Sequence, residues 1–497
     1  MFFTRGSYAE NLQTFVDLHG YQLKSQLKKL NVELSEHPSL RILLINTSEL
    51  GGGAEESVRN LLQAYRSRGH QSWLAVGSKR SNDPNVLLIP QDSCRNFWAK
   101  FWIRAADELE RFQDKVRGAT RLLNLLRWIG EPSRQRAQAQ GHEDFDFPGT
   151  WQLPKLYGLP DVFHCYNLHG GYFDLRALTW LSHQRPVILD LRDAWLLSGH
   201  CAHSFACERW KTGCGQCPDL RIYPRIRRDA TSYNWRRKQS IYAKSRVYVS
   251  TPCQWLMRKV EQSMLAPAIV ESRIIPTGID LAIFHPSARE VVRADLRIPQ
   301  NAKVVLFTAN GIRKNMWRDY RTMRDAIGLV AERLRGHMVV FIGLGEIALG
   351  ETALDERIGK AHLRFIPHQK NPQTVARYYQ AADLYVHAAR ADTFPRAVLE
   401  ALACGTPVLA TAVGGIPEQV KSLTGVNSFT IADATGIIVP MGDVQTVAAG
   451  IEKLLTDDLL RRALGENAAK DARQRFDLQK QVDCYLEWYN KLLSDPP

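Results

Sequence analysis

The chain has 497 residues, of which 45% are hydrophobic and 23% are charged, and its formal net charge is +14. This composition is typical of a globular protein with full hydrophobic cores, and it excludes a largely disordered chain. At roughly 100–200 residues per domain the length predicts two to four domains, and no apolar run approaches the roughly 18 residues that cross a bilayer.

The first residues, MFFTRGSYAENLQTF, lack the apolar segment of a secretory signal peptide. We therefore expect a cytoplasmic protein, a compartment that disfavours disulfide bonds. Basic residues are concentrated between Arg221 and Arg246, where nine of them accompany one acid, Asp229. Such a segment either attracts phosphate groups, as in nucleic acid, an anionic membrane or a phosphorylated substrate, or forms a solvated helix face.

In chain order, a predicted helical extension over residues 1–37 is followed by apolar runs that alternate with helical segments. The runs of the first series are LRILLIN (40–46), QSWLAVG (71–77), DVFHCYN (161–167), RPVILDL (185–191) and RVYVSTP (246–252). After a mixed segment, the runs of the second series are KVVLFTAN (303–310), HMVVFIGLG (337–345), LRFIP (363–367), DLYVHAA (383–389), TPVLATA (406–412) and TGIIVP (435–440). Strands that alternate with helices predict βαβ units and parallel sheets covered on both faces.

This alternation predicts an α/β fold with two doubly wound, Rossmann-like domains that face each other across a cleft. We place the first domain at residues 38–285 and the second at 286–470, followed by a helix over 471–497 that packs back across the domains. In such sheets ligands bind beyond the carboxyl ends of the strands. The loops that follow the strands are therefore the places where a site is expected.

A long helical segment, residues 94–140, interrupts the first domain and is rich in Trp and Arg. One interpretation is a basic amphipathic surface that contacts a membrane or an acceptor. The other is a buried helical hairpin.

The segment ADTFPRAVLEALACGTPVLATAVGGIPE, residues 391–418, combines several features of a ligand site. Asp392 falls in the loop after a predicted strand and Glu400 in the next helix, so both carboxylates can face the cleft and accept hydrogen bonds from sugar and ribose hydroxyls. The N-terminus of this helix offers free N–H groups and the positive end of its dipole, which suit a diphosphate. The residues that can donate a backbone N–H there are Thr393, Phe394 and Arg396.

The segment resembles the donor-binding region of glycosyltransferase family 4, retaining enzymes with the GT-B fold. The family pattern is E-x7-E, followed by EA-x-A-x-G-x-P-V and a GG-x-x-E turn. Here the run is Glu400-Ala-Leu-Ala-Cys-Gly-Thr-Pro-Val408, and the turn is Gly414-Gly-Ile-Pro-Glu418. The resemblance covers both domains except the helical insertion, and Asp392 replaces the first Glu of the pattern.

The resemblance implies roles for residues of the second domain. Glu400 is expected to hold the ribose hydroxyls of the nucleotide, and Asp392 to lie near the donor sugar. In this family a basic pair after the first strand of the second domain grips the pyrophosphate, and here the pair is Arg313 and Lys314, with Arg318 as a substitute. Fixed cations at that place stabilise the charge that a leaving nucleoside diphosphate gains.

The resemblance also extends to the first domain. Gly52 and Gly53 follow a predicted strand and open a helix, and in the family a Gly-rich loop here lets the backbone approach the donor phosphates and the acceptor. Family members often carry a His where this chain has Arg192, so we expect Arg192 to contact the substrate. His169 lies at another strand end, where it either lines the cleft or serves as a structural histidine.

Four cysteines fall in the loop 199–218, and only the C-G-Q-C pair has a spacing usual for metal ligands. A similar stretch appears in a branch of family 4 related to colanic-acid and capsule glycosyltransferases. A structural zinc, free buried thiols and a disulfide are the three interpretations, and a catalytic zinc is disfavoured because four protein ligands leave no open position. The residues concerned are Cys201, Cys207, Cys214 and Cys217.

These features predict a retaining glycosyltransferase that moves a sugar from a nucleoside-diphosphate donor, linked to UDP or GDP, to a hydroxyl acceptor. The expected acceptor is a glycan or a lipid-linked oligosaccharide in surface polysaccharide synthesis. The resemblance implies that catalysis needs no cofactor, that zinc would be structural only, and that the leaving phosphate helps to deprotonate the acceptor.

With its basic segment against an anionic membrane, the enzyme is expected in the cytoplasm, peripheral to the inner face of the membrane, and without a nucleic-acid partner. Two alternatives remain at this stage. One is a GT-B sugar-nucleotide epimerase, and the other is a zinc-containing nucleic-acid-binding protein, which the net charge and the cysteine cluster would suit.

Overall fold

The structure is a computed structural model that describes residues 39–110, 119–156, 158–334, 336–347, 354–425 and 428–494. Residues Arg41–Pro497 form one compact unit. The helical extension predicted over residues 1–37 lies outside the described residues.

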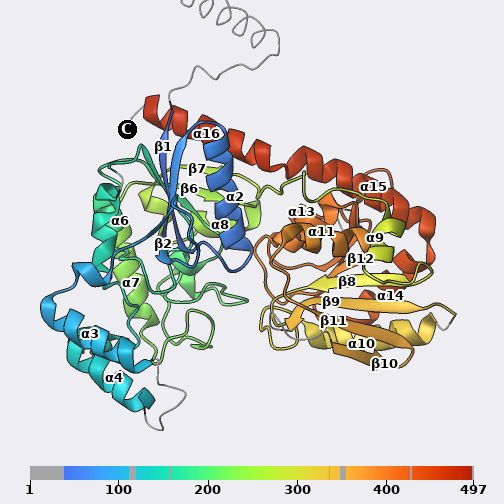
Figure 1. Ribbon diagram of the computed structural model, residues 1–497, viewed down its shortest axis with the longest axis horizontal. Coiled ribbons are helices and arrows are strands. Elements are labelled where there is room, and N and C mark those ends of the chain that lie inside the picture. Colours follow the sequence, from blue (N-terminus) through green and yellow to red (C-terminus); the bar gives the residue numbers. More distant parts are fainter. Residues whose placement is uncertain are drawn as a thin grey trace, which may run out of the picture. The chain divides into compact units, whose positions relative to one another are not determined.

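The first seven strands form one sheet in the order β3-β2-β1-β4-β5-β6-β7, in which every neighbouring pair is parallel (Figure 1). The order reverses between β1 and β4, which is the place where doubly wound sheets bind ligands. The strands are β1 (Arg41–Ser48), β2 (Gln71–Ser78), β3 (Val86–Leu88), β4 (Val162–Cys165), β5 (Val187–Asp190), β6 (Val247–Thr251) and β7 (Ile269–Ile274). The α-helices associated with them are α2 (Gly53–Ser67), α6 (Ala177–Leu181), α7 (Thr231–Tyr242) and α8 (Gln254–Glu261).

The second sheet has the order β10-β11-β9-β8-β12-β13-β14 and is parallel except for the antiparallel pair β10 and β11. Its order reverses between β8 and β12. The strands are β8 (Lys303–Thr308), β9 (Val339–Ile347), β10 (Leu354–Ile358), β11 (Ala361–Pro367), β12 (Leu384–His387), β13 (Val408–Thr411) and β14 (Gly436–Val439). The helices are α9 (Arg289–Asp295), α10 (Tyr320–Arg333), α11 (Pro372–Ala381), α12 (Arg396–Ala403), α13 (Ile416–Gln419), α14 (Val444–Thr456) and α15 (Asp458–Arg475).

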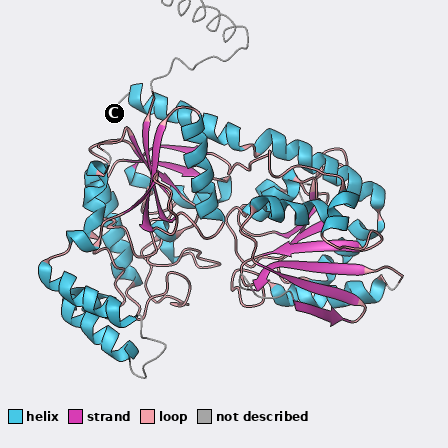
Figure 2. Cartoon of the chain, viewed as in Figure 1, coloured by secondary structure: helices cyan, strands magenta, loops and turns pink. Residues whose placement is uncertain are grey.

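Burial on both faces explains why the central strands are continuous apolar runs. Every residue of β12 and of β13 is buried, because helices cover both sides of a parallel sheet (Figure 2). The second sheet carries one apolar core on each face. The predicted α/β fold class, with two doubly wound parallel sheets, is confirmed.

The helix α16 (Leu478–Ser494) follows the second sheet in the chain but packs against α2 of the first. The hydroxyl of Tyr485 donates to Asp190 at the end of β5 (2.8 Å). The hydroxyl of Tyr489 lies 2.6 Å from Nδ1 of His164 in β4. Both tyrosines and Trp488 are fully buried, so this helix forms part of the core that surrounds the first sheet.

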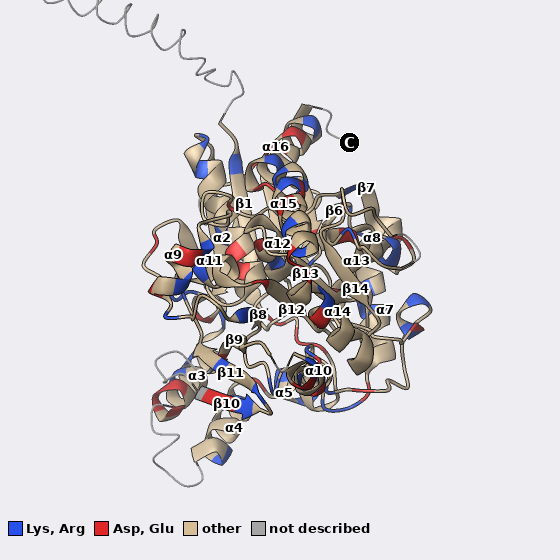
Figure 3. Ribbon diagram, turned by 90° about the vertical axis from the view of Figure 1, so that its right-hand side faces the viewer, with Lys and Arg blue, Asp and Glu red and all other residues tan. Residues whose placement is uncertain are grey.

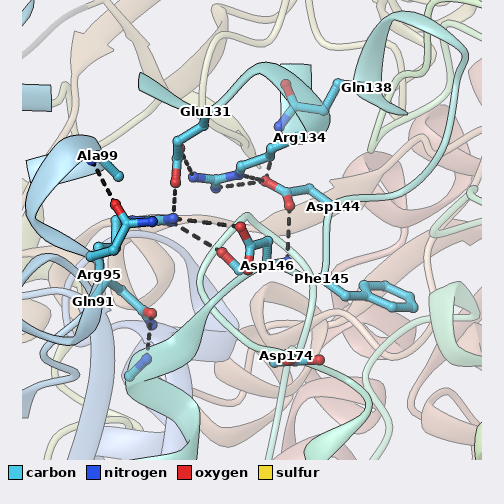
Figure 4. A network of polar contacts seen from close by, with 12 residues as sticks. Gln91, Arg95, Ala99, Glu131, Arg134, Gln138, Asp144, Phe145, Asp146 and Asp174 are labelled. Atoms are coloured by element: carbon cyan, nitrogen blue, oxygen red, sulfur yellow. Dashed lines mark hydrogen bonds and ion pairs between the residues drawn. The ribbon is translucent and has the colours of Figure 1, made fainter. Parts of the chain in front are cut away.

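The insertion predicted at residues 94–140 contains the helices α3 (Phe97–Glu110), α4 (Ala119–Gly130) and α5 (Pro132–Ala139). A network of ion pairs joins it to the first domain (Figure 4). Glu131 binds Arg95 and Arg134, and Arg134 also binds Asp144 (2.6 Å). The helices α3 and α4 do not form a buried hairpin, because several of their large apolar side chains are exposed. These side chains are Phe97, Trp98, Phe101, Leu122, Leu125 and Trp128.

The charge of the chain is not confined to one element. In the view of Figure 3, acidic and basic positions are interspersed along the helices. The basic segment retains exposed positions at Arg221, Arg225, Arg227 and Arg228. None of the helices within the described ranges is long and apolar enough to cross a membrane.

Candidate functional site

The loop between β12 and α12 places Asp392 beside two basic side chains. Its Oδ2 accepts a hydrogen bond from Arg318 (2.9 Å) and lies 3.4 Å from Nε2 of His387. Burial alone would raise the pKa of Asp392, but the charge of Arg318 and the contact with His387 outweigh it and hold the pKa below its ordinary value. Asp392 is therefore a fixed anion at this end of the motif.

Glu400 lies one helical turn into α12, where its carboxylate is buried. Its Oε2 lies 3.0 Å from the hydroxyl of Tyr379, and its Oε1 accepts a hydrogen bond from Nε of Arg396 (3.2 Å). Burial raises the pKa of Glu400, although the charge of Arg396 opposes this. The two carboxylates of the motif thus have opposite electrostatic surroundings.

Arg396 is a basic residue of the site whose side chain the sequence did not single out. Its guanidinium is almost fully buried, yet neither terminal nitrogen has a hydrogen-bond partner. The nearest other anion is the carboxylate of Glu56, 3.6 Å from Nη2. Because buried guanidinium groups are normally satisfied, these nitrogens are available to an anionic ligand.

The glycine loop of the first domain meets the motif helix at Arg396. Gly52 and Gly53 stand at the N-terminus of α2, and the N–H of Gly52 donates to Glu55 (2.8 Å). A Cβ added at Gly53 would lie 3.3 Å from the side chain of Arg396. The structure therefore brings the predicted glycine loop and the predicted motif helix together.

The turn Gly414–Glu418 packs against the same loop. Gly414 has a φ of +56°, and a Cβ there would overlap the carbonyl oxygen of Asp392. The carboxylate of Glu418 accepts hydrogen bonds from the N–H groups of Gln254 and Trp255 (both 2.7 Å) at the start of α8. The turn thus links the Asp392 loop to the first domain.

Arg313 and Lys314 lie apart from the two motif carboxylates. Arg313 donates from Nε to Glu346 (2.6 Å) and from Nη1 to Glu356 (3.1 Å), and Lys314 is exposed. The basic residue of this loop that contacts Asp392 is Arg318. The winding of the loop explains the difference, because Asn315 caps a turn that directs Trp317 and Arg318 toward the segment after β12. The role of Arg313 and Lys314 stays a prediction.

His169 and Arg192 lie in different environments within the first domain. Nε2 of His169 is 2.6 Å from Asp193, and its ring contacts Trp195 and Tyr223. Arg192 is mostly buried and pairs with Asp190 (2.7 Å), while it also donates to Thr277. Arg192 therefore has protein partners, and its contact with substrate stays a prediction.

The cysteine loop reaches the second domain through its aromatic residues. The ring of Phe205 stacks on Trp317, with centroids 5.6 Å apart, and His203 stacks on Trp255 at the same separation. These contacts place the loop next to the segment that carries Arg318. Sequence reasoning missed them because it considered the cysteines of this loop and not its aromatic residues.

The four thiols themselves are free. Without a bound metal, burial raises the pKa of Cys201 to about 11 and that of Cys214 to about 12. Among the residues that the structure describes, no group of three or more His, Cys, Asp or Glu side chains is arranged to hold a metal ion. The geometry therefore gives the zinc prediction no support, and the metal content remains to be measured.

Comparisons with known proteins agree on the second domain and on the fold. Residues 288–471 match the family Glycosyl transferases group 1. The D-inositol 3-phosphate glycosyltransferase of Saccharomonospora viridis is 29% identical over 339 residues, which cover 65% of this chain and 71% of that protein. The D-inositol 3-phosphate glycosyltransferase 1 of Catenulispora acidiphila is 34% identical over 230 residues, which cover 44% of this chain and 51% of that protein.

Among solved structures, Anabaena HepE in complex with UDP-glucose has a TM-score of 0.56 and 17% identity, and the alignment covers 91% of this chain and all of that one. This likeness shows that the two Rossmann-like sheets have the GT-B arrangement. Neither the epimerase nor the nucleic-acid-binding alternative is favoured by these matches.

Proposed function

We propose that the protein is a retaining glycosyltransferase of family 4 that transfers a sugar from a UDP- or GDP-linked donor to a hydroxyl group of a glycan or a lipid-linked acceptor. The observation that carries the proposal is the grouping of Asp392, Arg396 and Glu400 around the N-terminus of α12, against the glycine loop of the first domain. The UDP-glucose held by the Anabaena protein of the same fold supports a nucleotide-sugar donor.

In this proposal the nucleotide lies along α12. Glu400 accepts the ribose hydroxyls, and the unpartnered terminal nitrogens of Arg396 bind the diphosphate together with the free N–H groups at the start of the helix. Arg318 is the cation nearest to the sugar end, where it also fixes Asp392. Arg313 and Lys314 extend the positive charge farther from the motif.

The chemistry follows from these charges. Cleavage of the glycosidic bond places negative charge on the leaving diphosphate, and guanidinium groups that are already fixed in position stabilise that charge without reorganisation. The leaving phosphate oxygen accepts the proton of the incoming hydroxyl on the same face of the sugar, which retains the anomeric configuration. No side chain has to act as the base.

The exposed apolar side chains of α3 and α4 support a membrane-associated acceptor. Phe97 is 85% exposed, and Trp98 and Trp128 are each more than half exposed, an unusual condition for aromatic residues of a water-exposed helix. Lys100, Arg104 and Arg121 accompany them on the same two helices. Aromatic and basic residues on one amphipathic element fit the interface of an anionic bilayer, and we place the protein on the cytoplasmic face of the membrane.

The test is turnover of a panel of UDP-, GDP- and ADP-sugars by the full chain, with and without a membrane lipid extract. The expected result is release of one nucleotide, at a rate that rises with the extract, and a product with the anomeric configuration of the donor. Folded protein that releases no nucleotide from any donor would contradict the proposal. Release that does not respond to the extract would contradict the lipid-linked acceptor only.

A further inference from the structure

A chain of polar groups connects the two carboxylates of the motif beneath the proposed donor site. From Glu400 the contacts pass to the hydroxyl of Tyr379 (3.0 Å) and then to Oγ1 of Thr308 (3.3 Å). From Thr308 they pass to the hydroxyl of Tyr385 (3.1 Å) and then to Nδ1 of His387 (2.9 Å). We call these four contacts the carboxylate relay.

The far end of the relay faces Asp392. Nε2 of His387 lies 3.4 Å from Oδ2 of Asp392, and this nitrogen is buried without a hydrogen-bond partner. The other groups that face the ring are the hydroxyl of Tyr385 and the guanidinium of Arg318. The charge of the His387 ring therefore acts directly on the carboxylate of Asp392.

The fold holds the relay rigidly. Thr308 ends β8, and Tyr385 and His387 stand two positions apart on β12, so their side chains share one face of the sheet. Tyr379 projects from α11, and it is fully buried, as are the two residues of β12. The relay crosses the point where the strand order of the second sheet reverses.

Counting protons shows that the relay cannot be satisfied by its hydroxyl groups alone. Four contacts need four protons, but Tyr379, Thr308 and Tyr385 supply one each. The fourth has to come from one of the two ends, either from the carboxyl group of Glu400 or from Nδ1 of His387. The relay therefore has two complete arrangements, which run in opposite directions.

With the proton on Glu400, each hydroxyl donates toward His387, and the neutral ring accepts at Nδ1 and keeps its proton on Nε2. With the proton on Nδ1, each hydroxyl donates toward an ionised Glu400, and the ring is an imidazolium that keeps Nε2–H toward Asp392. Burial raises the pKa of Glu400 and lowers that of His387, and both directions act in favour of the first arrangement, while the charge of Arg396 opposes the shift at Glu400. The two arrangements differ by one proton moved from Glu400 to His387.

We propose that Tyr379, Thr308, Tyr385 and His387 are positioning residues that couple nucleotide binding at Glu400 to the charge beside Asp392. A carboxylate accepts hydrogen bonds from ribose hydroxyls more strongly than a carboxylic acid does, so nucleotide binding favours the ionised form of Glu400. Its proton then passes along the relay, and each oxygen hands one proton to the next. The proton arrives on Nδ1 of His387, and the imidazolium then pairs with Asp392 at the sugar end. The coupling rests on the proposed function, since it assumes that Glu400 receives the ribose.

Calorimetry of nucleoside-diphosphate binding tests where this proton goes. The full chain is titrated with UDP or GDP, whichever the donor panel identifies, in two buffers of equal pH and different ionisation enthalpy. The wild type is expected to release fewer protons than Tyr385→Phe and Thr308→Val, whose broken relay leaves the proton of Glu400 to the buffer. Tyr378→Phe, which removes a hydroxyl from the residue that precedes Tyr379 in α11, is the matched control and should behave as the wild type.

The same variants are expected to bind the nucleotide more weakly by the size of the coupling, roughly fivefold or more. Equal proton release by the wild type and both relay variants would overturn the relay. In that case, binding of the nucleotide to the wild type and to both relay variants would confirm that the donor site itself is intact. Absence of binding to the wild type would overturn the proposed function, and the relay with it.

Nitrogen-15 NMR of the histidine side chains gives a second readout that a structural role would not move. The signals of His387 are identified by their loss in His387→Gln. They are expected to change from a neutral ring with Nε2–H to an imidazolium when the nucleotide is added, and to stay neutral in Tyr385→Phe. An unchanged wild-type signal at saturating nucleotide would contradict the transfer.

Discussion

Gly414 lies directly over the backbone of Asp392, so that a side chain at position 414 would overlap the carbonyl oxygen of residue 392. Its φ of +56° is also one that glycine adopts most readily. This contact explains why the GG-x-x-E turn accompanies the carboxylate motif in the sequence. The turn holds the loop that carries Asp392.

Gly414→Ala is therefore expected to reduce donor turnover strongly by displacing the Asp392 loop. The matched control is Gly442→Ala, because Gly442 has a φ of +78° but open space around it. Both variants bear the backbone cost of about 1–2 kcal/mol for a left-handed alanine, which thermal unfolding measures, but only the first adds the overlap. Equal loss of turnover in the two variants would show that the overlap does not matter.

Glu400→Ala is expected to weaken binding of the nucleoside diphosphate by roughly 10- to 100-fold, the usual effect of losing hydrogen bonds to a charged group. Calorimetry with the nucleotide alone isolates this effect from the chemistry. The control is Glu452→Ala, which removes an exposed carboxylate of α14 that pairs with Arg333. An unchanged nucleotide affinity in Glu400→Ala, with the fold intact, would remove the ribose assignment.

Arg318→Ala is expected to lower kcat by about a hundredfold, the order of magnitude for removal of one fixed donor to a developing anion. Arg313→Ala is the comparison, because Arg313 is held by Glu346 and Glu356 and does not contact Asp392. Its effect is expected to be much smaller. Steady-state kinetics of both variants measures which loss of kcat is larger. A larger loss in Arg313→Ala would restore the sequence-based assignment of Arg313 to the pyrophosphate.

Structural zinc in the cysteine loop is a prediction that metal analysis decides. If it is correct, purified protein contains zinc and protein chain in equal molar amounts. Cys217→Ser is then expected to lose the metal and to unfold at a lower temperature, because metal binding contributes folding free energy. Cys484→Ser, at an exposed cysteine of α16, is the control and should keep the metal. Protein that is folded and free of zinc would contradict the zinc prediction and leave the four residues as the partly exposed, free thiols that the structure shows.

Membrane contact through α3 and α4 predicts that Trp98→Ser and Trp128→Ser each reduce sedimentation with anionic vesicles by about tenfold or more, given the free energy of burying a large apolar side chain. The control is Leu459→Ser, since Leu459 is 81% exposed but lies on α15. Turnover of a water-soluble acceptor should be unaffected. Vesicle binding that all three variants retain would place the membrane contact elsewhere.

The strands were predictable because both faces of the sheets are covered, which makes each central strand a short continuous apolar run. The three strands that sequence reasoning missed are exceptions to this rule. β3 has three residues. β7 (IVESRI) is an edge strand in which partly buried and exposed residues alternate, and β10 (LDERI) is an antiparallel edge strand with charged side chains. A pattern of buried runs detects none of them.

The carboxylates of the motif were predictable, but the basic groups around them were not. Whether Arg313 or Arg318 contacts Asp392 depends on how one loop is wound, and no periodicity encodes this. Tyr385 and His387 read as part of an apolar run, and only the packing of α11 against β8 and β12 reveals that their polar atoms are joined. Contacts made between distant segments are what the sequence pattern leaves out.

The burial of α16 against the first sheet has a consequence for how the chain is made. Tyr485, Trp488 and Tyr489 fill the core beside β4 and β5, yet the ribosome synthesises them only after the entire second sheet. During synthesis the first domain is therefore incomplete until the second domain has emerged, and Tyr65 and His164, which both contact Tyr489, are uncovered until then. An isolated fragment that ends before α16 would expose an apolar surface that favours aggregation.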